Sequence, residues 1–417
     1  MSREILEKID YLVGSADIIE SMPDLPLKVP FADDVKKYLS DVSKVLMKDS
    51  RSKQHSDVIT FAFWIRKASI AQLEDRYAFE DKNFHLGRGI AFHIAPSNVP
   101  VNFAYSLVSG LLTGNANIVR VPSKDFPQVE IIADAIRVTL ERYKEMKPYI
   151  ALIRYEHNKD VNDELSLIAD TRIIWGGDRT IEEVRKSSLP PRSTEITFAD
   201  RYSIALIDSD AYMEIEDKMG VAFDFYNDTY FSDQNACTSP RVVIWTGDKK
   251  EEAKEIFWNK LYEVVKEKYL FQDIQGVNKL TSALLSASME SEPSSSVDDS
   301  MNKYGAHVEE HDDNLMIRVS VKKIDSTLMN YMDNCGFFFE YDCRNIMELK
   351  VLCNDKKCQT IGMLGNAKML EPLVRSGIKG VDRVVSIGHT MDFDFLWDGY
   401  QLIQALTRVV CFNLAGE

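Results

Sequence analysis

Short apolar runs alternate with amphipathic segments between residues 87 and 187. The short runs are typical of buried strands, whereas apolar positions recurring every three to four residues are typical of helices. Strand, turn, helix and strand in succession form right-handed βαβ units, so the pattern predicts a mostly parallel sheet. The expected strands are 89–95, 117–121, 150–153 and 172–175, and the expected helices are 103–111, 127–140, 160–170 and 180–187.

The flanking parts of the chain show weaker patterns. Residues 1–85 are predicted to be mostly helical, and 250–270 to form one long amphipathic helix. The prolines of the stretch 190–193 interrupt the alternation, and we place a domain boundary there, with the second unit starting near Asp200. A serine-rich acidic stretch at 286–300 is expected to be an exposed loop, because it lacks the apolar residues of a core.

Composition limits the classes of function. A chain of 417 residues with 45% apolar and 28% charged residues fits a globular protein of two or three domains. The net charge of −15 argues against nucleic acid or an anionic membrane surface as a partner. No apolar run approaches the roughly 20 residues of a membrane span, and the first residues lack a signal-peptide core. We therefore expect a cytoplasmic protein.

Six cysteines invite a search for a metal site or disulfides. They are Cys237, Cys335, Cys343, Cys353, Cys358 and Cys411. Their spacing does not repeat a zinc pattern, and no histidine lies among the four between 335 and 358. We expect neither a structural metal nor disulfides, which are rare in cytosolic proteins.

Cys237 has the sequence context of a nucleophile. It lies in a polar, turn-forming stretch that runs directly into the apolar residues 242–245. This order places a thiol on a loop at the mouth of a buried strand, and Arg241 supplies a positive charge that favours the thiolate. A thiolate is a nucleophile for acyl transfer. The alternative is a small buried residue at the start of a strand.

Three turns follow predicted strands, at the edge where parallel sheets bind ligands. In the turn 96–100, two prolines flank Asn98, whose amide is either a preorganised oxyanion donor or a partner of the turn itself. Arg120 ends the next strand, where it meets a phosphate or solvent. The turn Gly176-Gly177-Asp178 presents backbone amides to a phosphate, or is a plain glycine-rich turn.

Two of the seven histidines have informative neighbours. His93 lies inside an apolar strand and is interpreted as a core histidine with satisfied hydrogen bonds. His389 follows Ile387-Gly388 and is a candidate general acid or base.

Taken together, these segments resemble the fatty acyl-CoA reductases of the LuxC type, which supply aldehyde in bacterial bioluminescence and belong to the aldehyde dehydrogenase superfamily. The resemblance covers most of residues 87–410 in chain order. Its motifs lie at 94–100, 113–123, 175–178, 233–237, 380–385, 392–394 and 397–400.

The resemblance implies an α/β fold with a Rossmann-like cofactor domain and a second α/β catalytic domain. We expect the NAD(P)-binding domain with a helical extension at 1–200 and the catalytic domain at 201–390. The segment 391–417 is expected to pack on the cofactor domain or at an oligomer interface.

The resemblance also assigns roles to residues. Cys237 corresponds to the acyl-accepting nucleophile, and Asn98 to the oxyanion donor. Arg120 stands where the superfamily usually has a lysine that touches the adenosine ribose, and its planar guanidinium suits a 2′-phosphate, which implies NADPH. The residues implied to contact the cofactor are Ala95, Pro96, Ser97, Arg120, Pro122, Ser123, Gly176, Gly177 and Asp178.

Two departures from the superfamily bear on the reaction. The glutamate that activates water in aldehyde-oxidising members is missing from the matching segment 198–203. Without that base an acyl-cysteine persists until hydride or a thiol captures it, which favours thioester reduction. The glutamate motif that holds the nicotinamide ribose has no clear counterpart near 334–337.

The implied function is NADPH-dependent reduction of a fatty acyl thioester, carried by coenzyme A or by a protein, to the aldehyde. An acyl-protein synthetase or acyltransferase partner and a homo-oligomer are expected. Three alternatives stay open: an NAD-linked acylating aldehyde dehydrogenase for short acyl-CoA, a catalytically silent acyl-binding subunit, and an acyl phosphate reductase.

Overall fold

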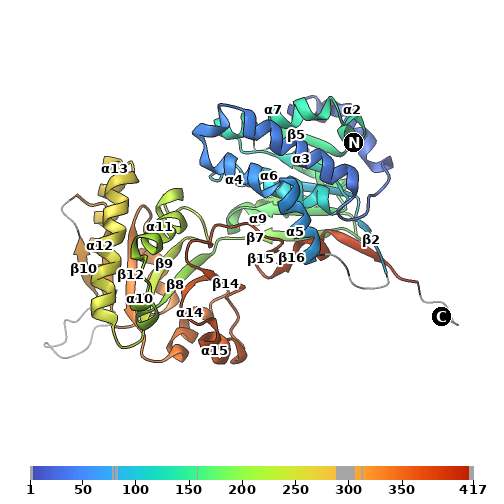
Figure 1. Cartoon of the computed structure of the whole chain (residues 1–417). Coiled ribbons are helices and arrows are strands. Elements are labelled where there is room, and N and C mark those ends of the chain that lie inside the picture. Colours follow the sequence, from blue (N-terminus) through green and yellow to red (C-terminus); the bar gives the residue numbers. More distant parts are fainter. Residues whose placement is uncertain are drawn as a thin grey trace. The chain divides into compact units, whose positions relative to one another are not determined.

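The computed structural model describes residues 3–77, 79, 83–156, 158–287, 306–310 and 313–412. The chain divides into two compact units, unit 1 with residues 1–199 and 395–417, and unit 2 with residues 200–394 (Figure 1). Residues 288–300 of the serine-rich stretch lie outside the described residues. None of the helices within these ranges has both the length and the apolar character needed to cross a membrane.

Unit 1 is an α/β unit. Its helices are α1 (Arg3–Leu6), α2 (Ala16–Ser21), α3 (Asp33–Lys48), α4 (Ser56–Trp64), α5 (Lys67–Tyr77), α6 (Asn102–Leu112), α7 (Pro127–Leu140), α8 (Lys159–Leu167), α9 (Asp178–Val184) and α16 (Leu402–Ala405). Its strands are β1 (Asp10–Val13), β2 (Phe84–Gly87), β3 (Ile90–Ile94), β4 (Ala116–Arg120), β5 (Ile150–Arg154), β6 (Thr171–Trp175), β7 (Thr194–Phe198), β15 (Leu396–Trp397), β16 (Tyr400–Gln401) and β17 (Thr407–Val410).

The main sheet of unit 1 has the order β1-β5-β4-β3-β6-β7. Strands β3 to β7 are mutually parallel, and β1 pairs with β5 in the antiparallel direction at one edge. With β3 as the first strand, β5-β4-β3-β6-β7 is the 3-2-1-4-5 arrangement of Rossmann-type sheets. The strand order reverses between β3 and β6, where such sheets bind their ligands.

The C-terminal segment belongs to unit 1. Strand β17 pairs with β2 in the antiparallel direction, from Thr407 opposite Gly87 to Val410 opposite Phe84. These pairs attach the end of the described chain to the strand that precedes β3.

Unit 2 is also α/β. Its helices are α10 (Ser209–Glu214), α11 (Lys218–Asp228), α12 (Lys250–Lys268), α13 (Asp273–Ala287), α14 (Lys350–Cys353) and α15 (Glu371–Arg375). Its strands are β8 (Tyr202–Asp208), β9 (Pro240–Thr246), β10 (His307–Glu310), β11 (Ile317–Val321), β12 (Phe337–Asp342), β13 (Cys358–Leu364) and β14 (Arg383–Ser386).

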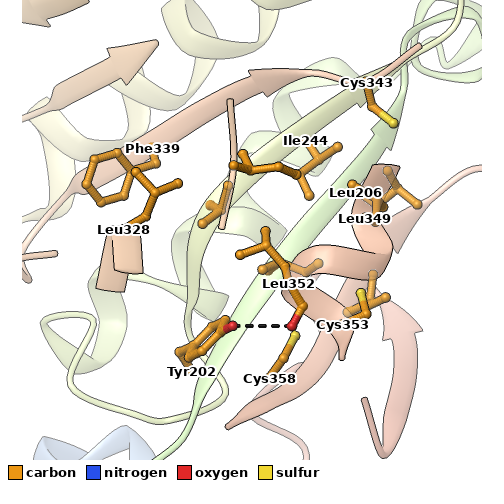
Figure 2. Packing of buried hydrophobic residues seen from close by; sticks show 14 of the residues in the cluster. Tyr202, Leu206, Ile244, Leu328, Phe339, Cys343, Leu349, Leu352, Cys353 and Cys358 are labelled. Carbon is orange, nitrogen blue, oxygen red and sulfur yellow. Dashed lines mark hydrogen bonds between the residues drawn. The ribbon is translucent and has the colours of Figure 1, made fainter. Parts of the chain in front are cut away.

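The sheet of unit 2 has the order β10-β11-β12-β9-β8-β13-β14, and all of its strands except β10 are mutually parallel. Aromatic residues of α11 and α12, such as Phe225 and Phe257, pack in one apolar cluster with Trp245 of β9. A second cluster joins residues of the strands to Leu352 of α14 and its neighbours (Figure 2). Because the strands are parallel, the loops that precede β8, β9, β12 and β13 meet at one edge, which we call the amino edge.

Candidate active site

Cys237 lies at the amino edge of the unit 2 sheet, three residues before β9 begins. It is partly exposed, and its carbonyl accepts a hydrogen bond of 2.8 Å from the hydroxyl of Ser203, the second residue of β8. The predicted position of the thiol at the mouth of a buried strand is therefore confirmed, because every residue of β9 is buried. We call residues 231–239 the Cys237 loop.

The Cys237 loop has an unusual backbone. Asp233 and Gln234 adopt φ values of 51° and 57°, in the left-handed region that residues other than glycine seldom occupy. Cys335, with φ of 60°, donates its backbone N–H to the carbonyl of Asp233 at 3.1 Å. Such conformations persist only where the surroundings hold them, and they cluster at functional sites.

The side chain of Gln234 supplies much of that hold. It is fully buried, and its amide donates to the carbonyls of Pro240 (2.9 Å) and Phe337 (3.1 Å). Its oxygen accepts from the backbone N–H groups of Gly336 (2.9 Å) and Phe337 (3.2 Å). Gln234 thus joins the Cys237 loop to the start of β12, a role that the sequence gives no signal for because the partners lie about a hundred residues apart.

Arg241 has a second role beside the one inferred from sequence. Its side chain is buried and donates to the carbonyl of Asp333 at 2.8 Å, to the side-chain oxygen of Asn334 and to the carbonyl of Gln234. Burial lowers the pKa of Arg241 to about 10, while the charge of the Cys237 thiolate is among those that oppose the shift. The guanidinium therefore stays charged near neutral pH, interacts with the thiol and clamps the loop.

The turn 387–392 contacts the Cys237 loop. The hydroxyl of Thr238 donates to the sulfur of Met391 at 3.2 Å. The buried carboxylate of Asp228 accepts from the backbone N–H groups of Gly388 (2.7 Å) and Thr390 (3.0 Å), and its desolvation raises its pKa to about 6. The turn is therefore fixed to the end of α11.

His389 lies on this turn and is exposed. Its Nδ1 lies 2.7 Å from the Asp392 carboxylate, and this hydrogen bond raises the pKa of the imidazole, together with the charges of Asp228 and Asp224. The structure thus places a titratable imidazole on a turn that touches the Cys237 loop.

The predicted cofactor residues lie at the carboxyl edge of the unit 1 sheet. Ala95, Pro96 and Ser97 follow β3, and the backbone N–H of Ala95 donates to the carbonyl of Arg120 at 3.0 Å. Pro122 and Ser123 follow β4, on one side of β3, and Gly176-Gly177-Asp178 follows β6, on the other. The three turns thus meet where the strand order reverses. Asn98 is exposed in the first of them.

Arg120 is held by Tyr155. Its Nη2 donates to the carbonyl of Tyr155 at 3.3 Å, and its guanidinium lies 4.5 Å from the centre of that ring. Arg120 is partly exposed, whereas the Tyr155 ring beneath it is buried. The guanidinium is therefore fixed in orientation at the carboxyl edge, more than a solvated charge would be.

His93 is a core histidine, as predicted. It is fully buried, with Nδ1 2.7 Å from the hydroxyl of Ser106 and Nε2 3.0 Å from the side-chain oxygen of Asn117. Trp175 donates its indole N–H to the same Ser106 hydroxyl at 3.0 Å. Desolvation lowers the pKa of His93 from 6.5 to about 4, so the imidazole is neutral in the folded protein.

This burial predicts a loss of stability in acid. The unfolded chain binds a proton at His93 near pH 6.5 and the folded chain only near pH 4. The contribution of the neutral imidazole to the free energy of unfolding is therefore fully present above pH 6.5 and is lost as the pH drops towards 4. Between pH 7 and pH 5 the loss is about 2 kcal/mol. Urea denaturation across this range should show a shallower pH dependence for His93→Gln than for the wild type. An unchanged pH dependence would contradict this role of His93.

The remaining cysteines are free thiols. Cys335, Cys343, Cys353 and Cys358 are buried and Cys411 is exposed. Within the described ranges, no group of three or more histidine, cysteine or acidic side chains is arranged to hold a metal ion.

Comparison with known proteins gives matches in sequence. A family model described as Acyl-CoA reductase (LuxC) matches residues 71–409. The long-chain acyl-protein thioester reductase of Vibrio harveyi is 30% identical over 169 residues, which are 40% of this chain and 34% of that protein. The enzyme of the same name from Aliivibrio fischeri is 29% identical over 164 residues, 39% of this chain and 33% of the relative. The chain spans about a third of the length of these curated relatives.

Solved structures share the fold at low sequence identity. A 1-pyrroline-5-carboxylate dehydrogenase from Thermus with bound NAD has a TM-score of 0.59 at 13% identity, covering 94% of this chain and 83% of that one. Lactaldehyde dehydrogenase from Escherichia coli has a TM-score of 0.59 at 13% identity, covering 94% and 88%. The predicted aldehyde-dehydrogenase-like α/β fold is confirmed.

Proposed function

Because this chain belongs to the LuxC family of acyl-CoA reductases, we propose that it reduces a fatty acyl thioester to the aldehyde with NADPH, through an acyl-cysteine on Cys237. The proposed donor is an acyl-CoA, the substrate named in the family description, or an acyl-protein, the substrate named for the Vibrio harveyi and Aliivibrio fischeri relatives.

One observation carries the proposal: a partly exposed thiol on a loop that buried hydrogen bonds hold in a strained conformation. A buried cysteine of purely structural use, such as Cys353 in the core of unit 2, needs no such support. A nucleophile does, because attack on a carbonyl requires a fixed approach.

In the proposed reaction the Cys237 thiolate attacks the carbonyl carbon of the donor thioester. A new carbon–sulfur bond forms to Cys237, the bond to the donor sulfur breaks, and the donor leaves as a thiolate that takes up a proton. The amide of Asn98 and the backbone N–H of Cys237 are proposed to donate to the oxyanion. Arg241, charged and buried behind the loop, favours the thiolate form of Cys237.

The carboxyl edge of unit 1 suits a nicotinamide dinucleotide. Small residues occupy the turns on both sides of the strand reversal, Ala95 and Ser97 after β3 and Gly176 and Gly177 after β6, and they leave the backbone accessible to a pyrophosphate. Arg120 presents a planar cation, which favours a 2′-phosphate and therefore NADPH. The cofactor, when bound, supplies the hydride that reduces the acyl-cysteine.

The segment 198–203, which lacks the water-activating glutamate, forms structural contacts in unit 2 through Arg201. Arg201 forms an ion pair with Asp382 and donates to the carbonyls of Lys356 (3.0 Å) and Cys358 (3.2 Å). These contacts tie the start of β8 to β13. Because the segment lacks the water-activating glutamate, we propose that the acyl-cysteine resists hydrolysis and passes to reduction.

The direct test is a steady-state assay with tetradecanoyl-CoA and either NADPH or NADH, in which tetradecanal is identified by gas chromatography. Aldehyde formation with a preference for NADPH is the expected result. Rapid turnover of acetaldehyde with NAD and coenzyme A would favour the acylating dehydrogenase instead, and faster reduction of an acyl phosphate would favour the third alternative.

Arg120 offers a test of cofactor choice. Arg120→Ala is expected to raise the KM for NADPH about 10- to 100-fold and the KM for NADH less than about 3-fold, because only NADPH carries the 2′-phosphate. Arg120→Lys, which keeps the charge but loses the planar fork, should fall between the two. Equal effects on both cofactors would show that Arg120 does not read the 2′-phosphate.

A further inference from the structure

We propose that a basic surface beside Cys237 docks the acidic face of the protein that carries the acyl thioester. This inference rests on the proposed function and adds to it the location of the donor. The surface, which we call the lysine surface, consists of Lys350, Lys356, Lys357, Arg375 and Lys379.

Charge is distributed unevenly in this chain. The whole sequence carries 50 lysine and arginine residues against 65 acidic ones, whereas residues 344–383 carry eight against four. All four acids have local partners: Asp382 pairs with Arg201, Glu371 lies 3.7 Å from Arg375, and Glu348 and Asp355 accept hydrogen bonds from the hydroxyls of Tyr341 and Tyr202. All five side chains of the lysine surface are exposed. A locally basic surface therefore stands on a strongly acidic protein.

Hydrogen bonds join the two segments that carry these side chains. The ammonium group of Lys350 lies 3.4 Å from the carbonyl of Ser376, and the backbone N–H of Gly380 donates to the carbonyl of Cys353 at 2.9 Å. A side chain at Gly380 would meet the carbonyl of Asp355 at 2.1 Å. The chain after α15 thus runs beside α14 and the turn that follows it, which brings the two segments that carry these side chains together.

The lysine surface borders the edge that carries the nucleophile. Tyr202 and Ser203 open β8, and the backbone N–H of Tyr202 donates to the carbonyl of Lys357 at 2.9 Å while the hydroxyl of Ser203 donates to the carbonyl of Cys237 at 2.8 Å. Strand β8 lies between β9, which follows Cys237, and β13, which follows Lys357. Two strand spacings separate these strands, which is about 10 Å.

The form of the surface favours a protein as its partner over the phosphates of coenzyme A. A diphosphate is held by donors that converge in a cleft, often with the fork of an arginine. Here four lysines and one arginine are spread over the ends of α14 and α15 and over two turns. Exposed charges of this kind steer a complementary surface and raise its rate of association.

The test compares acylation of Cys237 by three tetradecanoyl thioesters, those of the acidic acyl carrier protein, of coenzyme A and of uncharged N-acetylcysteamine. We expect Lys350→Glu, Lys356→Glu and Lys379→Glu together to slow acylation by the carrier protein about 10- to 100-fold at low ionic strength. High salt should shrink this difference, because screening weakens exposed charges. Acylation by the N-acetylcysteamine thioester should change less than about 3-fold.

A matched variant reverses three exposed lysines elsewhere in unit 2, Lys249, Lys266 and Lys322, and should leave acylation by the carrier protein nearly unchanged. The proposal is overturned if the lysine-surface variant accepts the carrier thioester at the wild-type rate, or if all three donors slow equally. A loss as large with acyl-CoA as with the carrier protein would assign the surface to phosphates instead.

Binding can be followed apart from chemistry. Fluorescence anisotropy of labelled carrier protein with the Cys237→Ala protein reports docking whether or not acyl transfer occurs. If no donor acylates the wild type but the carrier still binds and loses affinity in the lysine-surface variant, the proposed function fails while the docking surface stands. If the carrier protein binds neither the Cys237→Ala protein nor the lysine-surface variant, the docking surface is overturned.

Discussion

Cys237→Ala is expected to lower the rate of aldehyde formation from tetradecanoyl-CoA at least about 1,000-fold, because no acyl-enzyme forms without the thiolate. The measurement is the single-turnover rate at saturating NADPH. The substitution removes only a sulfur from a partly exposed side chain, and the carbonyl that accepts from Ser203 stays in place. The variant should therefore unfold at the same urea concentration as the wild type.

Cys411→Ala is the matched control, since Cys411 is likewise outside any disulfide and is exposed in unit 1. It should keep the wild-type rate. Substantial aldehyde formation by Cys237→Ala would contradict this role of Cys237. It would mean that another residue is the nucleophile or that the thioester is reduced directly. A folded Cys237→Ala protein that still supports acyl transfer by a partner enzyme would favour the silent acyl-binding subunit.

The second large effect is expected at Gln234. Gln234→Ala removes four hydrogen bonds to buried backbone groups of Pro240, Gly336 and Phe337. Each buried group left without a partner costs about 1 to 3 kcal/mol, so the loss of all four should lower the free energy of unfolding of unit 2 by at least about 4 kcal/mol. Urea denaturation measures that loss. Because Gln234 also holds the Cys237 loop, the acylation rate should fall in the variant even at temperatures where it is folded.

Asn235→Ala is the neighbouring control. Asn235 is exposed, and its side-chain oxygen accepts one hydrogen bond of 2.7 Å from Asn334. Its replacement should cost less than about 1 kcal/mol, because water can replace the lost partner. Equal stability losses at the two positions would show that the buried hydrogen bonds of Gln234 do not hold the Cys237 loop.

The parallel part of the unit 1 sheet could be predicted from the sequence because its strands are buried on both faces, and such strands are recognisable from their own residues. All five residues of β3 and of β6 are buried, so each strand appears as an apolar run between turn residues. Strand β1 escaped this pattern. It is a four-residue antiparallel edge strand, starting with the exposed Asp10, within a region predicted to be mostly helical.

The candidate site was predictable where chemistry resides in one residue and its neighbours. Cys237 and the turns around Ala95 and Gly176 were identified from their positions after or before strands. The support of the Cys237 loop was not, because it depends on contacts between distant parts of the chain. Gln234 bonds Phe337, and Asp228 holds the turn at Thr390.

The roles of single charged residues were the hardest to predict from the sequence. Arg241 was interpreted as a cation near the thiol, yet its three acceptors are two backbone carbonyls and the side-chain oxygen of Asn334, so it also clamps the loop. The lysine surface likewise emerges only when the sheet brings Lys357 and Cys237 to the same edge. Spacing along the sequence does not contain that proximity.

The most direct test of the central claim is intact-protein mass spectrometry after incubation with tetradecanoyl-CoA, with and without NADPH. We expect a mass increase of one tetradecanoyl group, absent from Cys237→Ala and discharged as tetradecanal when NADPH is added. No adduct with acyl-CoA, with a short acyl-CoA or with an acyl-protein donor, or an adduct that persists in Cys237→Ala, would contradict an acyl-cysteine at Cys237.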